Sequence, residues 1–177
     1  TQKIPFTALE ANFEQVDFVR KYGNKIYFGD ASRLDLLHAA GADKARIFVL
    51  AIDDVEASLK TAQMVKAHYP HLKIYARARN RMHAYQLMDL GVTVLMRETF
   101  LSSLELARDV LVGLGQTAAA ADEVARRFRV HDEQLLDKQR ALRHDEEQLI
   151  ASTRQARDEL ERLFEQDRAA VKQEDNV

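Results

Sequence analysis

The sequence predicts an α/β fold built on a parallel sheet whose strands alternate with helices. Short apolar runs typical of strands recur at 4–9, 25–28, 47–52, 73–76 and 92–96. Amphipathic helical stretches separate these runs, and a repeated order of strand and helix is typical of a parallel sheet. The composition changes once, near residue 113, after which the chain is predicted to be a helical, charged extension.

Local signals mark where the expected helices begin and end. Ser32 and Asp35 are spaced like a capping box at the start of one helix, and Gly41 closes that helix as a C-terminal glycine does. Pro70 ends the helix that starts near Asp53, because the residue before a proline is pushed out of helical space.

The C-terminal part of the chain has the pattern of one long charged helix. No glycine or proline follows Glu123. Apolar residues at a seven-residue spacing form one narrow seam: Leu135, Leu142, Leu149, Ala156 and Leu163. Because other core positions of this seam are polar, we expect a modest pairing with a partner helix. Docking of the helix on the chain's own domain is an equal alternative.

Charge and composition exclude several classes of function. The 177 residues include 26 basic and 28 acidic side chains, and a net charge of −2 disfavours binding to nucleic acid. The absence of cysteine excludes disulfides, a thiol nucleophile and thiolate metal sites. The longest apolar run, 47–52, is too short to cross a bilayer, so this piece is expected to be soluble. Because the chain begins at Thr1 without a methionine, we expect a further segment before it.

Polar residues follow the expected strands, at the edge where an open parallel sheet binds ligands. Glu10 ends the first run, and a carboxylate in that position accepts both hydroxyls of an adenosine ribose. Asp30 offers a second acceptor beside Ala31, which is small enough for an adenine ring to approach. Helix capping is the better explanation for Asp30, Asp53 or Asp54 taken singly. Their joint placement favours a nucleotide-binding site.

One part of a dinucleotide site is missing from the sequence. No glycine-rich G-x-G-x-x-G turn occurs, and the first strand is already the one that ends in the acidic residue. We therefore expect a Rossmann-like sheet whose first βα unit is absent, with the phosphate-binding turn upstream of Thr1. Without that turn hydride-transfer chemistry is not supported, and no enzyme is predicted.

Arginines follow neighbouring strand ends at Arg77, Arg79 and Arg97. An arginine fork binds a carboxylate through two hydrogen bonds, so this cluster indicates an anionic ligand. For each arginine, ion pairing with carboxylates around the same edge, such as Glu98 and Asp53, is an equal alternative.

The histidines do not predict a metal site. His68 and His71 straddle Pro70 and so do not share a helical face. His83 lies in an expected helix after Asn80 and could point at the strand-end crevice, although a lone helical histidine is more often structural.

Several motifs, taken in order, resemble a known family. They are VRKYG (19–23), YFGDASRLDLL (27–37), AIDD (51–54), HYPHL (68–72), ARAR (76–79) and RETF (97–100). Over roughly residues 1–130 the chain resembles the cytosolic regulatory (RCK/KTN) domain of Kef, the bacterial glutathione-gated potassium efflux system.

The resemblance implies a Rossmann-like nucleotide-binding regulatory domain at 1–100, crossover and dimerisation helices at 101–130, and a long charged helix at 131–177. It implies a homodimer that gates a membrane transport domain outside this chain, at the cytoplasmic face of the bacterial inner membrane. In this family glutathione holds the system closed and glutathione adducts of toxic electrophiles open it, so that potassium leaves and protons enter. An adenine nucleotide, AMP or NAD(H), occupies the Rossmann crevice, and an oxidoreductase-like ancillary subunit is a further partner.

The family's site residues carry over position by position. Arg97 matches the arginine that binds a glutathione carboxylate, and Tyr22 replaces a phenylalanine that senses the group on the glutathione sulfur. Asn80 stands where an aspartate is common. Arg129 stands where an asparagine contacts glutathione, so either Arg129 binds the ligand's carboxylate or the register differs by a turn. The implied nucleotide-binding residues are Glu10, Gly29, Asp30, Ala31, Ala51 and Arg77.

Other functions compatible with the sequence differ in what they bind. A nucleotide-sensing subunit of another potassium transporter binds nucleotide without glutathione. An NAD(P)-dependent oxidoreductase turns over a substrate, and a coiled-coil adaptor uses only residues 131–170. The homodimer is also expected on physical grounds, because the helix after the last strand has an apolar face at Leu101, Leu104 and Leu111.

Overall fold

The computed structural model describes residues 4–23 and 25–174. The chain divides into two compact units, Thr1–Glu98 and Thr99–Val177. We name them the sheet unit and the helical unit.

Strands and helices alternate throughout the sheet unit, which confirms the α/β prediction. The order is β1 (Leu9–Glu10), α1 (Phe13–Lys21), β2 (Tyr27–Phe28), α2 (Leu34–Ala39), the 3-10 helix η1 (Ala42–Lys44), β3 (Ile47–Leu50), α3 (Val55–His68), β4 (Lys73–Ala78), α4 (Arg81–Asp89) and β5 (Val94–Arg97). All strand pairs are parallel, because each helix returns the chain to the same end of the sheet.

The strands form two sheets where a single sheet was expected. β1 pairs with β2, and β3, β4 and β5 form a three-stranded sheet in that order. Within 4–23 and 25–174, no strand hydrogen-bonds to both β1 and β3, so the two sheets are separate.

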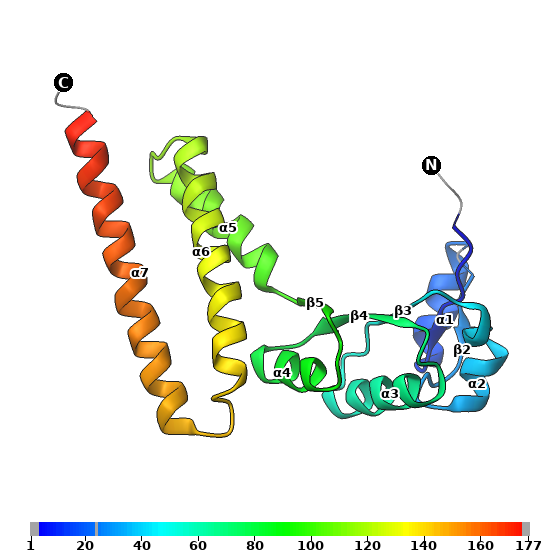
Figure 1. The fold of residues 1–177 in the computed structure, drawn as a ribbon. Helices are drawn as coiled ribbons and strands as arrows, with labels where there is room; N and C mark the ends of the chain where they lie inside the picture. The colour runs from blue at the N-terminus through cyan, green and yellow to red at the C-terminus, as the bar shows by residue number, and fades with distance from the viewer. Residues whose placement is uncertain (1–3, 24, 175–177) are drawn as a thin grey trace. The chain divides into compact units, whose positions relative to one another are not determined.

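Helices α3 and α4 cover one face of the three-stranded sheet (Figure 1). Side chains alternate along a strand, so every second residue points at these helices, and Leu50, Ile74 and Ala76 are buried there. The opposite face is open, since Val49 is 70% exposed and its register partner Tyr75 is also exposed. The core of this unit therefore lies on one side of the sheet.

Two of the expected helix boundaries are confirmed. Gly41 follows α2 with a φ of 85°, a left-handed conformation that favours glycine. Helix α3 ends at His68, before Pro70.

The capping box predicted at Ser32 and Asp35 is wrong. Helix α2 starts one residue later, after Arg33, and no side chain caps it. Ser32 instead donates its hydroxyl hydrogen to Asp30, and Asp35 accepts from Arg33 Nη2 at 2.6 Å. The Ser32 and Asp35 side chains thus bind charged neighbours and do not cap the start of the helix, so the box does not form.

The helical unit contains α5 (Phe100–Gly113), α6 (Ala118–Arg140) and α7 (Glu146–Glu174). Helices α6 and α7 run antiparallel as a hairpin (Figure 1). Helix α5 packs against α6, and Leu101, Leu104 and Leu111 are half-buried. In the part of the chain that the structure describes, none of the helices is long and apolar enough to span a membrane.

The single long helix expected over 131–177 is instead the end of α6 followed by α7, and 175–177 lie outside the described residues. The break has a local cause, although no glycine or proline marks it. Asp145 Oδ1 accepts the Gln148 N–H at 3.0 Å, and Gln148 Nε2 donates to Asp145 Oδ2 at 2.6 Å. Arg143 Nη1 donates to the Arg140 carbonyl at 2.8 Å and satisfies the preceding helix end. An N-cap inside an apparently continuous helix starts a new one.

The predicted seam is interrupted at Leu142, which lies in the turn between α6 and α7. The partner of the seam is within the same chain, because Leu136 and Gln139 of α6 and Ala156 of α7 are buried in the helical unit. Gln139 Nε2 donates to Thr153 Oγ1 at 3.0 Å. Gln139 and Thr153 are two of the polar positions of the seam, and they hydrogen-bond to each other between the two helices.

Candidate functional site

Four predicted nucleotide-binding residues lie together at the carboxyl end of the β1–β2 pair: Glu10, Gly29, Asp30 and Ala31. The Gly29 N–H donates to the Glu10 carbonyl at 2.9 Å, which holds the two strand ends together. Glu10 Oε1 accepts the Asn12 N–H at 2.8 Å, so the turn after β1 orients the carboxylate.

The Asp30 carboxylate is ionised and held in a tight turn. Its Oδ1 accepts the Ser32 N–H at 2.8 Å, and its Oδ2 accepts the Ser32 hydroxyl at 2.8 Å. These hydrogen bonds lower the pKa of Asp30, and the positive charges of Lys60 and Arg33 lower it further. Asp30 is therefore neither a helix cap nor a neutral group, and it remains able to accept further hydrogen bonds.

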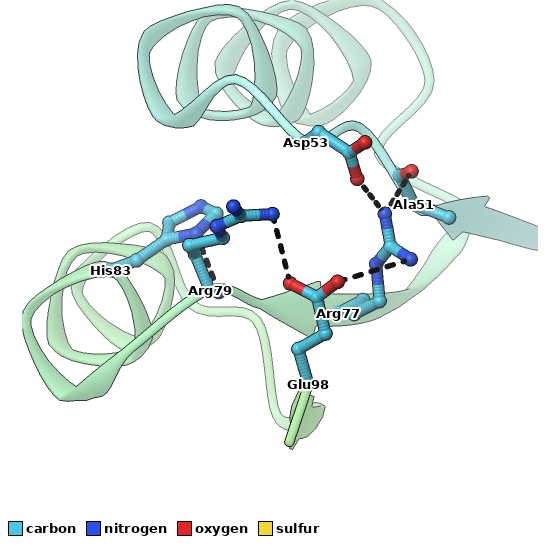
Figure 2. A network of polar contacts seen from close by, with 6 residues as sticks. All are labelled: Ala51, Asp53, Arg77, Arg79, His83 and Glu98. Carbon is cyan, nitrogen blue, oxygen red and sulfur yellow. Dashed lines mark hydrogen bonds and ion pairs between the residues drawn. The ribbon is translucent and has the colours of Figure 1, made fainter.

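Arg77 lies at the centre of a polar network at the carboxyl ends of β3, β4 and β5 (Figure 2). Its Nη2 donates to the Ala51 carbonyl at 3.0 Å and to the Asp53 carboxylate. Its Nη1 lies 3.7 Å from Glu98 Oε1. Ala51 and Asp53 follow β3 and Glu98 follows β5, so one guanidinium joins three strand ends.

Glu98 is shared by two arginines, since Arg79 Nη1 also lies 3.3 Å from its Oε2 (Figure 2). The ion-pair alternative is thus confirmed for Arg77 and Arg79. The capping alternative is confirmed for Asp54, whose side chain accepts the Ala57 N–H at 2.7 Å at the start of α3. A phosphate or carboxylate ligand that binds Arg77 or Arg79 at this edge has to displace Asp53 or Glu98 from that arginine. A role of Arg77 in nucleotide binding stays a prediction.

Asn80 and His83 hold the turn from β4 into α4. Asn80 Oδ1 accepts the His83 N–H at 2.9 Å, which makes Asn80 the N-cap of α4. His83 Nδ1 accepts the Arg79 N–H at 3.1 Å, and the residue is only 1% exposed. Burial lowers the pKa of His83. His83 is therefore a buried neutral side chain, in line with a structural role.

The other predicted glutathione-binding residues of the sheet unit lie at two different places. Arg97 ends β5 in register with Ala78 and is half-buried. Tyr22 follows α1 and is 71% exposed, with its ring centroid 5.1 Å from that of Phe18. The tyrosine ring is thus accessible to a ligand, but Tyr22 lies beside the two-stranded sheet and Arg97 at the end of the three-stranded one.

Arg129 belongs to α6 of the helical unit. Its Nε donates to Glu133 Oε1 at 2.8 Å, one helical turn away. The neighbouring Arg126 and Arg127 both donate to Glu123, and these hydrogen bonds lower the pKa of Glu123 to about 2. All three arginines of this motif are therefore paired with carboxylates on their own helix.

Both units match family models. The TrkA-N domain model matches residues 1–98, and the potassium efflux system KefB C-terminal domain model matches residues 102–177. A solved structure described as the Shewanella denitrificans Kef CTD in AMP bound form is 42% identical, with a TM-score of 0.68. The match covers 76% of this chain and 82% of that chain.

The chain belongs to the Kef family of regulatory C-terminal domains. It is thus a regulatory domain, of the RCK/KTN type, of a potassium efflux system. The TrkA-N domain of the inner membrane protein ybaL from Escherichia coli has the same fold. That structure is 21% identical with a TM-score of 0.51, and the match covers 64% of this chain and 80% of that chain.

A shallow pocket of this Kef domain has a lining that starts at Arg33, three residues after Asp30. Its walls come from α2, η1 and the end of α3, and its lining residues are Arg33, Leu34, Asp35, His38, Asp43, His68 and Tyr69. Arg33, Leu34 and Asp35 follow β2, whereas Asp43 precedes β3 and His68 and Tyr69 precede β4, so the lining is not confined to one end of the strands. Across the described ranges, no cluster of histidines and carboxylates has the composition of a metal site.

Two features of the Kef domain were missed by sequence reasoning. The N-cap bond from the His83 N–H to Asn80 has a signal in the sequence, because asparagine is a common N-cap residue, whereas the acceptance of the Arg79 N–H by His83 has none. The effect of Lys60 on Asp30 has no local signal, because α3 reaches the end of β2 only after folding.

Proposed function

We propose that this domain is the ligand-controlled gate of a bacterial potassium efflux system that exchanges potassium for protons. Glutathione holds the system closed, and glutathione S-conjugates open it. An adenine nucleotide, AMP or NAD(H), occupies the crevice at the carboxyl ends of the strands. The observation that carries the proposal is the 42% identical Kef domain described in AMP bound form.

The nucleotide part of the proposal is supported by the geometry of the β1–β2 edge. Glu10 ends β1, and its backbone is tied to Gly29 at the end of β2. The ionised Asp30 and the small Ala31 follow directly. A carboxylate at the end of β1 provides paired acceptors for ribose hydroxyls, and Asp30 lies where the adenine edge is expected. Ala51 and Arg77 line the neighbouring strand ends, joined by a 3.0 Å hydrogen bond.

The glutathione part rests on Arg97, Tyr22, Asn80 and Arg129. Glutathione carries two carboxylates and one ammonium, and a planar guanidinium binds a carboxylate through two hydrogen bonds. We assign Arg97 to one carboxylate of glutathione. We assign the exposed ring of Tyr22 to the group attached to the sulfur of an S-conjugate. Asn80 and Arg129 have partners in this structure, so their ligand contacts require exchange of a hydrogen bond or ion pair.

We include a homodimer in the proposal, with a different apolar surface from the one expected. Leu101, Leu104 and Leu111 are half-buried in the helical unit. The exposed apolar residues of α5 include Leu106, Val110 and Val112, and Leu106 and Val110 continue the same face to Leu114 just after the helix. Residues spaced by four lie on one helical face, and a stripe of this kind is stabilised by burial against a second copy.

The remaining partners follow from the place of such a domain in a transporter. A membrane transport domain of the same system binds at the cytoplasmic face of the bacterial inner membrane, and an oxidoreductase-like ancillary subunit is a further partner. No nucleic-acid partner is proposed, because the net charge of −2 gives no basic surface field.

Calorimetric titration tests the function. AMP, NAD, glutathione and one S-alkyl glutathione are titrated separately, and then glutathione is titrated in the presence of AMP. Binding of both AMP and glutathione supports the proposal. Binding of nucleotide alone indicates a nucleotide-sensing subunit of another potassium transporter, and turnover of a substrate indicates an oxidoreductase. Light scattering at roughly tens of micromolar, where weak interfaces assemble, tests the homodimer, and a monomer contradicts it.

A further inference from the structure

His83 has an unusual hydrogen-bonding state for a buried side chain. The residue is 1% exposed, and its Nδ1 accepts the Arg79 N–H at 3.1 Å. Its Nε2 is buried and has no hydrogen-bond partner among the described residues. Burial lowers the pKa of His83, which keeps the ring neutral at pH 7. A neutral imidazole carries one proton, and since Nδ1 is an acceptor, the proton is on Nε2.

The Arg79 N–H belongs to a peptide group that is held at both ends. The carbonyl of the same peptide group, that of Ala78, accepts the Glu98 N–H at 2.9 Å. His83 thus holds one end of the peptide plane, and the backbone of the residue after β5 holds the other. Rotation of this plane breaks both hydrogen bonds together.

This peptide group lies next to Arg77 and Arg79 in the chain. Arg77 precedes it by one residue and contacts Asp53 and Glu98, and Arg79 follows it and contacts Glu98 (Figure 2). The side chains of both arginines are partly exposed to water, so their pairs alone do not immobilise the turn. The buried His83 contact is the part of the network that is shielded from solvent.

We propose that His83 is a positioning residue for the strand-end arginines, and that its Nδ1 orients the Ala78–Arg79 peptide so that Arg77 and Arg79 face the ligand of the crevice. This inference rests on the proposed nucleotide function for its binding readout. Neither its burial nor its hydrogen bond to Arg79 depends on that function.

The test compares two substitutions at His83. Asn places an oxygen acceptor close to the position of Nδ1, whereas Leu fills similar space and accepts nothing. We expect His83→Leu to bind AMP about tenfold more weakly than the parent, as for the loss of one oriented hydrogen bond, and His83→Asn to recover most of that loss. Ser58→Ala is the matched control, because Ser58 on α3 is also buried and its Oγ is also unpartnered among the described residues.

Two spectroscopic readouts separate positioning from a merely structural role. Nitrogen-15 NMR of the parent is expected to show the Nε2–H tautomer of His83 at pH 7. The Arg79 amide is expected to exchange slowly with solvent in the parent and in His83→Asn, and at least tenfold faster in His83→Leu. If His83→Leu does not fold, three measurements test the positioning role of His83: the tautomer of His83 in the parent, and the AMP affinity and the Arg79 amide exchange of His83→Asn.

Three results overturn the proposal: an Nδ1–H tautomer, a folded His83→Leu that binds AMP like the parent, or a loss in His83→Leu that Asn does not repair. A parent protein that does not bind AMP contradicts the nucleotide function alone. In that case the tautomer and the exchange of the Arg79 amide still decide whether His83 orients the turn.

Discussion

The Arg77 guanidinium and the Glu98 carboxylate lie 3.7 Å apart at the ends of two adjacent parallel strands. The same carboxylate lies 3.3 Å from Arg79, and Asp53 also pairs with Arg77, so two acidic side chains face two arginines at the edge where the ligand is proposed to bind. The network therefore places positive charge at this edge and neutralises it in the absence of a ligand.

Replacing Glu98 by Gln is expected to lower the free energy of unfolding by about 1 kcal/mol or less, because both arginines are solvent-accessible and such pairs are weak. Urea unfolding at low and high salt measures the effect, and the difference from the parent is expected to shrink as salt rises. Glu105→Gln, an exposed charge on α5, is the control. A loss of several kcal/mol that persists at high salt contradicts this view of the network.

Glu10→Ala is expected to weaken AMP binding by about 1–3 kcal/mol, because two ribose hydroxyls lose their acceptor. Calorimetry and the AMP-dependent rise in melting temperature measure the loss. The variant also loses the acceptor of the Asn12 N–H, so its stability without ligand is measured alongside. Glu14→Ala, a nearby exposed carboxylate in α1, controls for the change of charge. Equal stabilisation of Glu10→Ala and parent by AMP refutes the assignment.

Arg97→Lys is expected to retain the fold and to lose about 1.5–3 kcal/mol of glutathione binding, the value of charge-assisted hydrogen bonds. Lysine keeps the charge but cannot offer the planar fork that a carboxylate requires. Calorimetric titration with glutathione and one S-alkyl adduct measures both affinities. Arg46→Lys, exposed just before β3 at the other edge of the sheet, is the control. If Arg97→Lys binds both ligands like the parent, the glutathione site lies elsewhere.

The stability of the sheet unit is expected to fall on mild acidification because of His83. Burial holds its pKa below the ordinary 6.5, so at pH values between the two the unfolded chain binds a proton that the folded chain does not. Stability from this group is complete above pH 6.5 and is lost as the pH falls toward the folded pKa. Unfolding across this range is expected to depend less on pH in His83→Asn than in the parent, and Ser58→Ala, which changes a buried residue without a titratable group, is expected to behave like the parent. Parallel profiles for the parent and His83→Asn contradict the prediction.

Asp145→Ala is expected to destabilise the helical hairpin by about 0.5–2 kcal/mol, the usual cost of losing an N-cap. The carboxylate accepts both the N–H and the side-chain amide of Gln148 at the start of α7. Urea unfolding followed by helical circular dichroism measures the change. Asp137→Ala, an exposed aspartate within α6, is the control, and an equal effect of the two substitutions argues against a special role for Asp145.

Local patterns predicted the elements of the sheet unit because strand and helix formation there depends on residues close in sequence. Apolar runs located β2, β3, β4 and β5, and Pro70 located the end of α3, whereas β1 shares only Leu9 with the run predicted at 4–9. The same reasoning failed at Ser32, where a neighbouring carboxylate competed for the hydroxyl. It also failed near Asp145, where a cap with the spacing Asp145-x-x-Gln148 was hidden in a sequence without glycine or proline.

The residue types at the strand ends were visible in the sequence, and so was their common edge, because all carboxyl ends of a parallel sheet lie on one side. Their pairing was not, since Arg77, Asp53 and Glu98 come from three different strand ends and only the register of β3, β4 and β5 determines which charges meet. The same holds for His83, because its burial and the peptide that it orients depend on the packing of α4 against β4. Periodicity and turn chemistry are local properties that any segment carries with it. Charge pairing and burial depend on distances between segments far apart in the chain, and these exist only in the folded protein.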